Sequence, residues 1–382
     1  MSSTNSANAR QRAVRIGKRW VGPGHPVYVI AEIGANFDGN LRRARQLIDL
    51  ALEAGADATK FQTYRADSLL CRRAFEDRKT RTPGRSDLTA WEACEQAELP
   101  RGWHRVLAEH CAKRGIDFLS SPYDREAVDL LVSLEVRAIK VGSGEITWLE
   151  MLDYLARQGR PLLLSTGASD LDEVRRAVEV IRAGGNDELV LLQSVSAYPT
   201  SFADAHLRAM ASLAEDFGLV TGYSDHSRGC TVPLGAVALG ASVIEKHFTD
   251  DKNRHGPDHA FALDFNEFRR LVEEIRQLEA ALGRPEKRRL PCERQTAVAQ
   301  RRGLYAARYL PAGATLAEDM LVVLRPADGL PASQWSRVIG QTLCQSVEPG
   351  EPLTAAHLGW DSQIDDAVEA DYATAGRAGA ST

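Results

Sequence analysis

The residues of this sequence that could do chemistry gather at the ends of short apolar runs. Two histidines, His226 and His247, each end such a run. Imidazole is a common ligand of divalent transition metals, and two histidines that converge beside a carboxylate are typical of a metal site. An isolated histidine is more often a capping or core residue, but this paired placement favours metal binding.

Two lysines, Lys60 and Lys140, also lie at the ends of apolar runs. Ammonium groups and hydroxyls together can hold a phosphate group through charge-assisted hydrogen bonds. On the residues alone, two other interpretations stay open. The lysines could be ion-paired to Glu32, Glu145 or Glu245, or one of them could form a Schiff base as in class I aldolases. The hydroxyls in question belong to Ser121, Ser143, Ser165 and Ser224.

The runs that carry these residues have the pattern of parallel strands buried on both faces. Amphipathic stretches at helical spacing lie between most of them. Eight strands that alternate with helices predict an α/β fold of the (β/α)8 TIM-barrel type, although a doubly wound open sheet has a similar pattern. In a barrel the carboxyl ends of the strands share one mouth, where the polar residues would meet. The predicted strands are 27–33, 58–63, 116–120, 137–141, 161–165, 189–193, 219–223 and 242–247.

The pattern changes after the eighth strand and its helix. We predict a barrel over 21–283, a charged and proline-bearing linker over 284–300, and a small second domain over 301–360. Residues 1–20 are predicted to be a flexible tail, and 361–382 a disordered one. Residues 65–100, polar and rich in arginine, are expected to form an extended loop over one face of the barrel.

Composition narrows the classes of function. The 382 residues carry a formal net charge of −5, which provides no electrostatic attraction to nucleic acid or to an anionic membrane. No apolar run has the length of a membrane span, and the first residues lack the apolar core of a secretory signal. The six cysteines are scattered and form no CxxC pair. We therefore expect a cytoplasmic protein with free thiols.

Several motifs, in order along the chain, resemble the N-acetylneuraminate (sialic acid) synthase family. They are AEIGANFDG (31–39), KFQTY (60–64), FLSSPYD (118–124), IKVGSGEIT (139–147), LLLSTGAS (162–169), SAYPT (196–200), GYSDHSRG (222–229), and EKHFT with GPDH (245–249 and 256–259). The segments RRGLYAARYLPAGATL (301–316) and LRPADGL (324–330) resemble the small antifreeze-protein-like (SAF) domain that follows the barrel in that family.

The resemblance implies an enzyme that condenses phosphoenolpyruvate with N-acetylmannosamine or a related 2-acetamido sugar. The products would be a nine-carbon 2-keto acid and phosphate. Synthases of the legionaminate and pseudaminate type, which use 2,4-diacetamido-6-deoxy hexoses, are the nearest alternative. A Schiff-base aldolase and a non-catalytic sugar-binding protein are the alternatives from other classes. The cofactor implied is a divalent metal, first of all Mn²⁺, with Mg²⁺ or Co²⁺ as alternatives.

The resemblance also implies roles for individual residues. His226 and His247 match the metal ligands, and Glu32 and Glu145 match the catalytic carboxylates. Arg325 matches an arginine that reaches the active site of a partner subunit, which implies a domain-swapped homodimer. Phosphoenolpyruvate would be bound by Lys60, Ser121, Lys140, Ser143, Ser165 and Ser224, and the sugar by Gln62, Glu145, Tyr198, Asp258 and Arg325.

Two stretches depart from the family's usual motifs. Asn36-Phe37-Asp38-Gly39 stands where N-H-N-G is common, and Ser196 stands where many members have asparagine. Both stretches are expected at the mouth of the site, where they would affect which sugar is bound.

Overall fold

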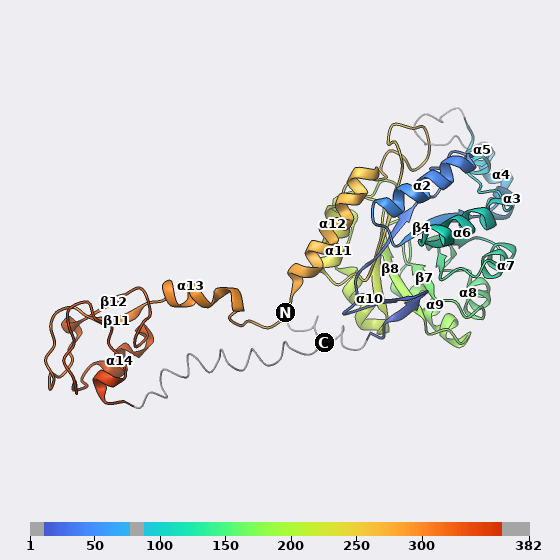
Figure 1. Ribbon diagram of the computed structural model, residues 1–382. Coiled ribbons are helices and arrows are strands. Elements are labelled where there is room, and N and C mark those ends of the chain that lie inside the picture. Colours follow the sequence, from blue (N-terminus) through green and yellow to red (C-terminus); the bar gives the residue numbers. More distant parts are fainter. Residues whose placement is uncertain (1–10, 77–87, 361–382) are drawn as a thin grey trace. The chain divides into compact units, whose positions relative to one another are not determined.

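The computed structural model describes residues 11–76 and 88–360, which form two compact units that divide between Gly283 and Arg284. The first unit is built on eight parallel strands with helices around them (Figure 1). All eight predicted strands are confirmed. They are β3 (Tyr28–Glu32), β4 (Ala58–Thr63), β5 (Asp117–Pro122), β6 (Ile139–Val141), β7 (Leu162–Ser165), β8 (Leu189–Ser194), β9 (Val220–Asp225) and β10 (Val243–His247).

Closure of the sheet identifies it as a barrel. The first of the eight strands, β3, pairs in parallel with the last, β10, so that Glu32 lies opposite His247. The strand order is β5-β4-β3-β10-β9-β8-β7-β6, and β5 and β6 are neighbours without a regular hydrogen-bonded ladder. The predicted (β/α)8 barrel is therefore confirmed in a nearly closed form, and an open doubly wound sheet is excluded.

The helices of the barrel follow the predicted amphipathic stretches. In the first of them the buried residues are Ala44, Leu47, Ile48 and Ala51, the spacing of one helical face. None of the helices in the described ranges combines the length and the apolar character needed to cross a membrane. The helices are α2 (Leu41–Glu53), α6 (Trp103–Arg114), α7 (Arg125–Ser133), α8 (Leu149–Ala156), α9 (Leu171–Ala183), α10 (Ala209–Phe217), α11 (Thr231–Ala238) and α12 (Phe265–Leu282), with short 3-10 turns η1 (Ser143–Glu145) and η2 (Phe202–Asp204).

The long connection between β4 and β5 is not the extended loop that we expected, at least in its described part. It contains the short helices α3 (Ala66–Leu69), α4 (Arg72–Phe75) and α5 (Ala90–Gln96). Helix α5 begins with a capping box, in which Thr89 and Glu92 bond each other's backbone N–H groups. Residues 77–87 lie outside the described residues.

The predicted N-terminal tail over 1–20 is wrong for its described part. Most of residues 11–20 belong to an antiparallel hairpin of β1 (Val14–Ile16) and β2 (Arg19–Val21). Val14, Ile16 and Val21 are buried against Tyr28 and the other apolar residues inside the barrel. This burial removes apolar surface from water at the amino-terminal end of the barrel, which orders the segment.

The second unit is small and mostly β-structured. β11 (Gly303–Ala306) and β12 (Leu321–Leu324) pair in antiparallel fashion over a core that includes Leu316 and Leu330. The predicted linker over 284–300 is partly helical, because it contains η3 (Pro291–Glu293) and α13 (Arg294–Ala299). The remaining elements are η4 (Glu318–Met320), η5 (Ala332–Gln334), α14 (Trp335–Val338) and η6 (Ala356–Leu358). The predicted tail over 361–382 lies outside the described residues.

The inside of the barrel has two layers of different chemistry. Successive residues of a strand point alternately inward and toward the helices. The inward residues nearer the amino ends are apolar, and they include Ile30, Leu119 and Leu163. Two residues further along each strand, the next inward position is polar, as at Glu32, Ser121 and Ser165. The apolar layer therefore forms the floor beneath the polar one.

The narrow barrel interior leads to a test of packing. A Cβ atom at Gly222 would lie 2.5 Å from the carbonyl oxygen of Val243 and 2.7 Å from a methyl carbon of Leu192. Overpacking of this kind costs about 1–3 kcal/mol. We expect Gly222→Ala to lower the free energy of unfolding by about that amount in urea titrations. Gly102→Ala is the control, because among the described residues no atom lies within 4 Å of its added Cβ. Equal stability of the two variants would contradict the packing described.

Candidate active site

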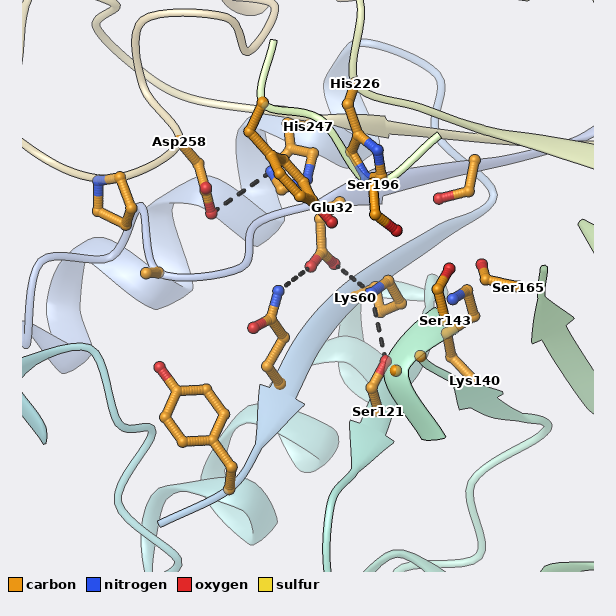
Figure 2. A pocket seen from close by; sticks show the side chains of 18 of the residues that line it. Glu32, Lys60, Ser121, Lys140, Ser143, Ser165, Ser196, His226, His247 and Asp258 are labelled. Carbon is orange, nitrogen blue, oxygen red and sulfur yellow. Dashed lines mark hydrogen bonds and ion pairs between the residues drawn. The ribbon is translucent and has the colours of Figure 1, made fainter. Parts of the chain in front are cut away.

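A cavity of about 580 Å³ opens at the carboxyl ends of the strands (Figure 2). Most of the residues predicted for the site line it, from all eight strands or the loops that directly follow them. They are Glu32, Lys60, Gln62, Ser121, Lys140, Ser143, Ser165, Tyr198, Ser224, His226, His247 and Asp258.

Two predicted residues are not among those that line the cavity. Glu145 ends the η1 turn after β6, and burial raises the pKa of its carboxyl group. Arg325 lies directly after β12 in the second unit, with an exposed side chain. The role of Arg325 stays a prediction.

The centre of the cavity is a buried ionic cluster. The Lys60 Nζ atom lies 3.0 Å from Glu32 Oε2 and 3.6 Å from Glu245 Oε1. The Lys140 Nζ atom lies 4.0 Å from the same Glu245 oxygen, which also accepts a 2.9 Å hydrogen bond from Ser224 Oγ. Ion pairing of the lysines, one of the interpretations left open by the sequence, is therefore confirmed for Glu32 and Glu245.

Glu245 is the main residue that the predicted site omitted. The sequence placed it at a strand end, and we considered it only as a partner of the lysines. Its position follows from the alternation along β10, because Glu245 lies two residues before His247 and points to the same side. Lys246 points to the other side, where its ammonium group lies 2.6 Å from Asp225 Oδ2. The same alternation from Ser121 brings Tyr123, also omitted, to the cavity wall.

The two carboxylates of the cluster have opposite tendencies to ionise. Burial raises the pKa of Glu32 to about 7. Burial also acts on Glu245, but the charges of Lys140 and Lys60 outweigh it and lower the pKa of that carboxyl group. Near neutral pH, Glu32 can therefore exchange a proton while Glu245 remains an anion.

The two lysines differ in the same way. Burial lowers the pKa of Lys140 to about 8. Burial acts in the same direction on Lys60, but Glu245 and Glu32 together raise the pKa of its ammonium group. Lys60 is therefore a permanent cation, whereas Lys140 loses its charge at mildly alkaline pH unless an anion binds beside it.

Several buried polar atoms of the cavity have no hydrogen-bond partner within residues 11–76 and 88–360. They are Glu32 Oε2, Ser165 Oγ, Glu245 Oε2 and His247 Nδ1, and of these Glu32 Oε2 is ion-paired with Lys60. Buried polar groups in folded proteins are nearly always satisfied, so unsatisfied ones that face a cavity indicate a ligand. Gln62 and Ser121 are already engaged, since Gln62 Nε2 donates to Glu32 Oε1 at 2.8 Å and Ser121 Oγ accepts from Lys60 at 3.3 Å.

The two predicted metal ligands lie next to each other. The ring centroids of His226 and His247 are 5.5 Å apart, and the ring of Tyr198 lies 4.2 Å from that of His226. His226 Nδ1 donates to the Val195 carbonyl oxygen at 2.8 Å, which leaves Nε2 unprotonated when the ring is neutral. Burial lowers the pKa of both imidazoles, which favours the neutral form that a metal requires.

The donor set fits a divalent ion with open coordination positions. Among the described residues, no group of three histidine, cysteine or carboxylate side chains is arranged to hold a metal. The neighbouring imidazoles are the donors that the cavity offers, and a divalent ion held by them would leave its other coordination positions to water or substrate oxygens. Asp258 Oδ2 lies 3.5 Å from His247 Nδ1, so a carboxylate stands beside one of the two rings. A dashed line joins the two side chains in Figure 2.

The departures from the family motif after β3 do not lie where we expected. Phe37 is buried outside the barrel wall, with ring centroids 6.4 Å from Phe61 and 6.3 Å from Trp103. Asp38 also lies away from the cavity wall and bonds His259 instead. The two departing side chains of this stretch therefore do not line the cavity, because its turn directs Phe37 into the core. Ser196, the other departure, does line the cavity.

Sequence analysis did not predict the outer wall of the cavity, because this wall is formed by the long connection between β4 and β5. Leu69 ends α3, Ala93 lies on α5 and Ala97 follows it, and all three line the cavity. Tyr64 adds an aromatic ring, which meets Tyr123 edge-on with centroids 5.7 Å apart. One side of the cavity is therefore ionic and the other is largely apolar.

Comparison with known proteins agrees with this geometry. The chain matches the NeuB family over residues 47–287 and the SAF domain over residues 301–359. It is 39% identical to an N,N'-diacetyllegionaminic acid synthase of Legionella pneumophila, over 87% of this chain and 94% of that protein. It is 35% identical to a pseudaminic acid synthase of Campylobacter jejuni, over 86% of this chain and 95% of that protein.

Solved structures show the same relationship. An N-acetylneuraminic acid (sialic acid) synthetase from Leptospira borgpetersenii, in complex with citrate, superimposes with a TM-score of 0.67 at 30% identity. The match covers 75% of this chain and 95% of that one. The extent of these matches shows that the chain belongs to the NeuB family and carries a C-terminal SAF domain.

Proposed function

We propose that the protein condenses phosphoenolpyruvate with the aldehyde form of an N-acylated amino sugar, to give a nine-carbon 2-keto acid and phosphate. The observation that carries the proposal is one cavity that combines two buried lysines with two adjacent histidines. Relatives that are named as synthases of legionaminic, pseudaminic and N-acetylneuraminic acids support it. A divalent metal, first of all Mn²⁺, is part of the proposal.

Phosphoenolpyruvate fits the ionic side of the cavity. Lys60 and Lys140 can meet its phosphate and carboxylate, and the unsatisfied Ser165 hydroxyl can donate to it. When Glu32 is protonated, the two lysines and Glu245 leave the cluster with one net positive charge. An anionic substrate would therefore favour the protonated form of Glu32. Ser121, Ser143 and Ser224 supply further hydroxyl groups around the same space.

The proposed reaction forms one carbon–carbon bond and breaks one carbon–oxygen bond. The methylene carbon of phosphoenolpyruvate attacks the sugar aldehyde, whose oxygen takes up a proton. When bound at His226 and His247, a divalent ion would polarise that aldehyde as a Lewis acid.

Positive charge then develops on the second carbon of phosphoenolpyruvate. Once its own proton has passed to the sugar oxygen, the Glu32 carboxylate is placed to stabilise this charge, or to take the proton of the water that adds there. Phosphate leaves with the bridging oxygen, the 2-keto group forms, and the lysines hold the charge of the departing phosphate.

The apolar side of the cavity suits the acyl and alkyl groups of the acceptor sugar. Leu69, Ala93 and Ala97 offer no hydrogen bonds to a free hydroxyl, but they can cover methyl groups. Both N-acetylmannosamine and a 2,4-diacetamido-6-deoxy hexose carry such groups. The diacetamido sugar has more of them, and the relative at 39% identity is named for a diacetylated product. We therefore propose a 2,4-diacetamido-6-deoxy hexose as the preferred acceptor.

A phosphate-release screen tests the activity and the acceptor together. Phosphoenolpyruvate would be supplied with N-acetylmannosamine, its 6-phosphate, or 2,4-diacetamido-6-deoxy hexoses. We expect inorganic phosphate only when a sugar is present, and the highest kcat/KM with a diacetamido sugar. Phosphate release that does not depend on sugar would contradict a condensation reaction, and covalent trapping by borohydride would favour a Schiff-base aldolase.

The first prediction concerns the metal. His247→Ala should lose Mn²⁺ binding in isothermal titration and lose activity, because only two protein side chains are proposed to hold the ion. The fold should survive, since His247 ends its strand above the apolar layer. His255→Ala is the control, because that side chain is exposed in the loop after the same strand. Full activity of His247→Ala in the presence of a chelator would refute the assignment.

The second prediction concerns pH. Since the pKa of Lys140 is lowered to about 8, raising the pH through that value neutralises its ammonium group. The kcat/KM for phosphoenolpyruvate should therefore fall above about pH 8, with a total loss of about 10- to 150-fold for one charge-assisted bond. Lys140→Arg should move this fall to higher pH, and Lys140→Met should abolish it. A value that stays constant from pH 7 to 9.5 would show that Lys140 does not bind the substrate.

The third prediction concerns the proposed domain-swapped homodimer, in which Arg325 would serve the partner's cavity. Arg325→Ala and His247→Ala should each give nearly inactive homodimers. Under conditions of subunit exchange, the mixture should regain activity, because a heterodimer contains one site with both residues intact. Full activity of Arg325→Ala alone, or no recovery despite demonstrated exchange, would contradict the shared site.

A further inference from the structure

Two loops at the barrel mouth are joined by a buried polar pair that the proposed chemistry does not use. One loop follows β3 and contains Asp38, and the other follows β10 and contains His259. His259 Nε2 lies 3.0 Å from Asp38 Oδ1, although 221 positions separate the two residues in sequence. On the other side of the ring, His259 Nδ1 lies 2.7 Å from Thr249 Oγ1. Both ring nitrogens are therefore engaged.

The histidine is held tightly in this position. Its side chain is fully buried, at 0% exposure. A Cβ atom at Gly256 would lie only 2.5 Å from His259 Cδ2, so the loop backbone closes directly over the ring. Asp38 also forms an ion pair with Arg43 on α2, which fixes the carboxylate from its other side.

The residue next to His259 is the one that faces the cavity. Asp258 accepts a hydrogen bond from the backbone N–H of Ala35, in the loop after β3. Its Oδ2 atom lies 3.5 Å from His247 Nδ1, and a Cβ at Gly34 would lie 2.8 Å from that oxygen. Asp258 therefore reaches from its own loop to the loop after β3, and its position depends on how the two loops are joined.

We propose that Asp38 and His259 form a clamp that positions Asp258 in the cavity, and that through it they set the binding of the acceptor sugar. The inference rests on the proposed function for its kinetic part. Neither clamp residue lines the cavity, so each is a positioning residue and not a catalytic one. Asp258 lies beside His247, whereas the lysines are ion-paired with Glu32 and Glu245, so phosphoenolpyruvate binding should be little affected.

The test uses pairs of variants that differ in one hydrogen bond. His259→Asn keeps an amide near the Nδ1 position but cannot reach Asp38, whereas His259→Gln places an amide near the Nε2 position. Asp38→Gly removes the carboxylate without strain, since Asp38 has a left-handed φ of 48°. Asp38→Asn retains an acceptor oxygen. Lys252→Gln is the matched control, because it breaks a 2.8 Å ion pair between the same loop and Glu267 without touching the clamp.

We expect His259→Asn and Asp38→Gly to raise the KM for the acceptor sugar about 10- to 100-fold, the range for a displacement of about 1 Å at a site. The KM for phosphoenolpyruvate should change less than about twofold. The double variant should be no worse than either single variant, because the two residues act through one bond. His259→Gln and Asp38→Asn should recover most of the loss, and Lys252→Gln should resemble the wild type.

Hydrogen exchange provides a readout that needs no activity. In His259→Asn and Asp38→Gly, the amides of residues 249–262 should exchange faster than in the wild type and in Lys252→Gln. Unchanged exchange in both variants would overturn the clamp even if the wild type shows no synthase activity, a result that would separately refute the proposed function. An unchanged acceptor KM, equal rises in both KM values, or additive effects in the double variant would also overturn it. If His259→Asn does not fold, Asp38→Gly and Asp38→Asn decide the question by the same measurements.

Discussion

The arrangement of the cavity depends on the ion pairs that Lys60 forms with Glu32 and Glu245. A buried ammonium group is tolerated only when carboxylates and hydrogen bonds replace its hydration. The two carboxylates come from the first and the last of the eight strands, so the pairing exists only because β3 and β10 lie side by side. The ionic cluster can therefore form only when the barrel closes between β3 and β10. Removal of Lys60 would leave the Glu32 carboxylate buried without its ion-pair partner.

The cluster also explains how similar side chains acquire different chemistry. Glu32 and Glu245 are both buried, but only Glu245 lies close to both lysines, so the pKa of Glu32 rises and that of Glu245 falls. Lys60 faces both carboxylates and Lys140 mainly one, so the pKa of only Lys140 falls. The apolar floor of the barrel makes these differences large, because it keeps water away from the lower side of the cluster.

On the side of the cavity that we assign to the acceptor sugar, side chains are positioned by contacts between loops. The strands can place only those side chains that point inward at their carboxyl ends. Asp258 stands beyond the strand end, in a loop with no such support of its own, and it is held by Ala35 of another loop. The buried contact between His259 and Asp38 joins these loops outside the cavity. The stability of the loops after β3 and β10 is therefore linked to the position of Asp258 in the cavity.

The sequence by itself determined the family, the eight strands and most of the residues that line the cavity, because apolar runs and the polar residues at their ends are local patterns. Only the tertiary structure decided the ordered hairpin of residues 14–21, the role of Glu245, the position of Phe37 outside the cavity, and the apolar wall from α3 and α5. Each of these depends on contacts between residues far apart in sequence. Burial and distance between such residues also set the pKa values, and no local pattern encodes either quantity.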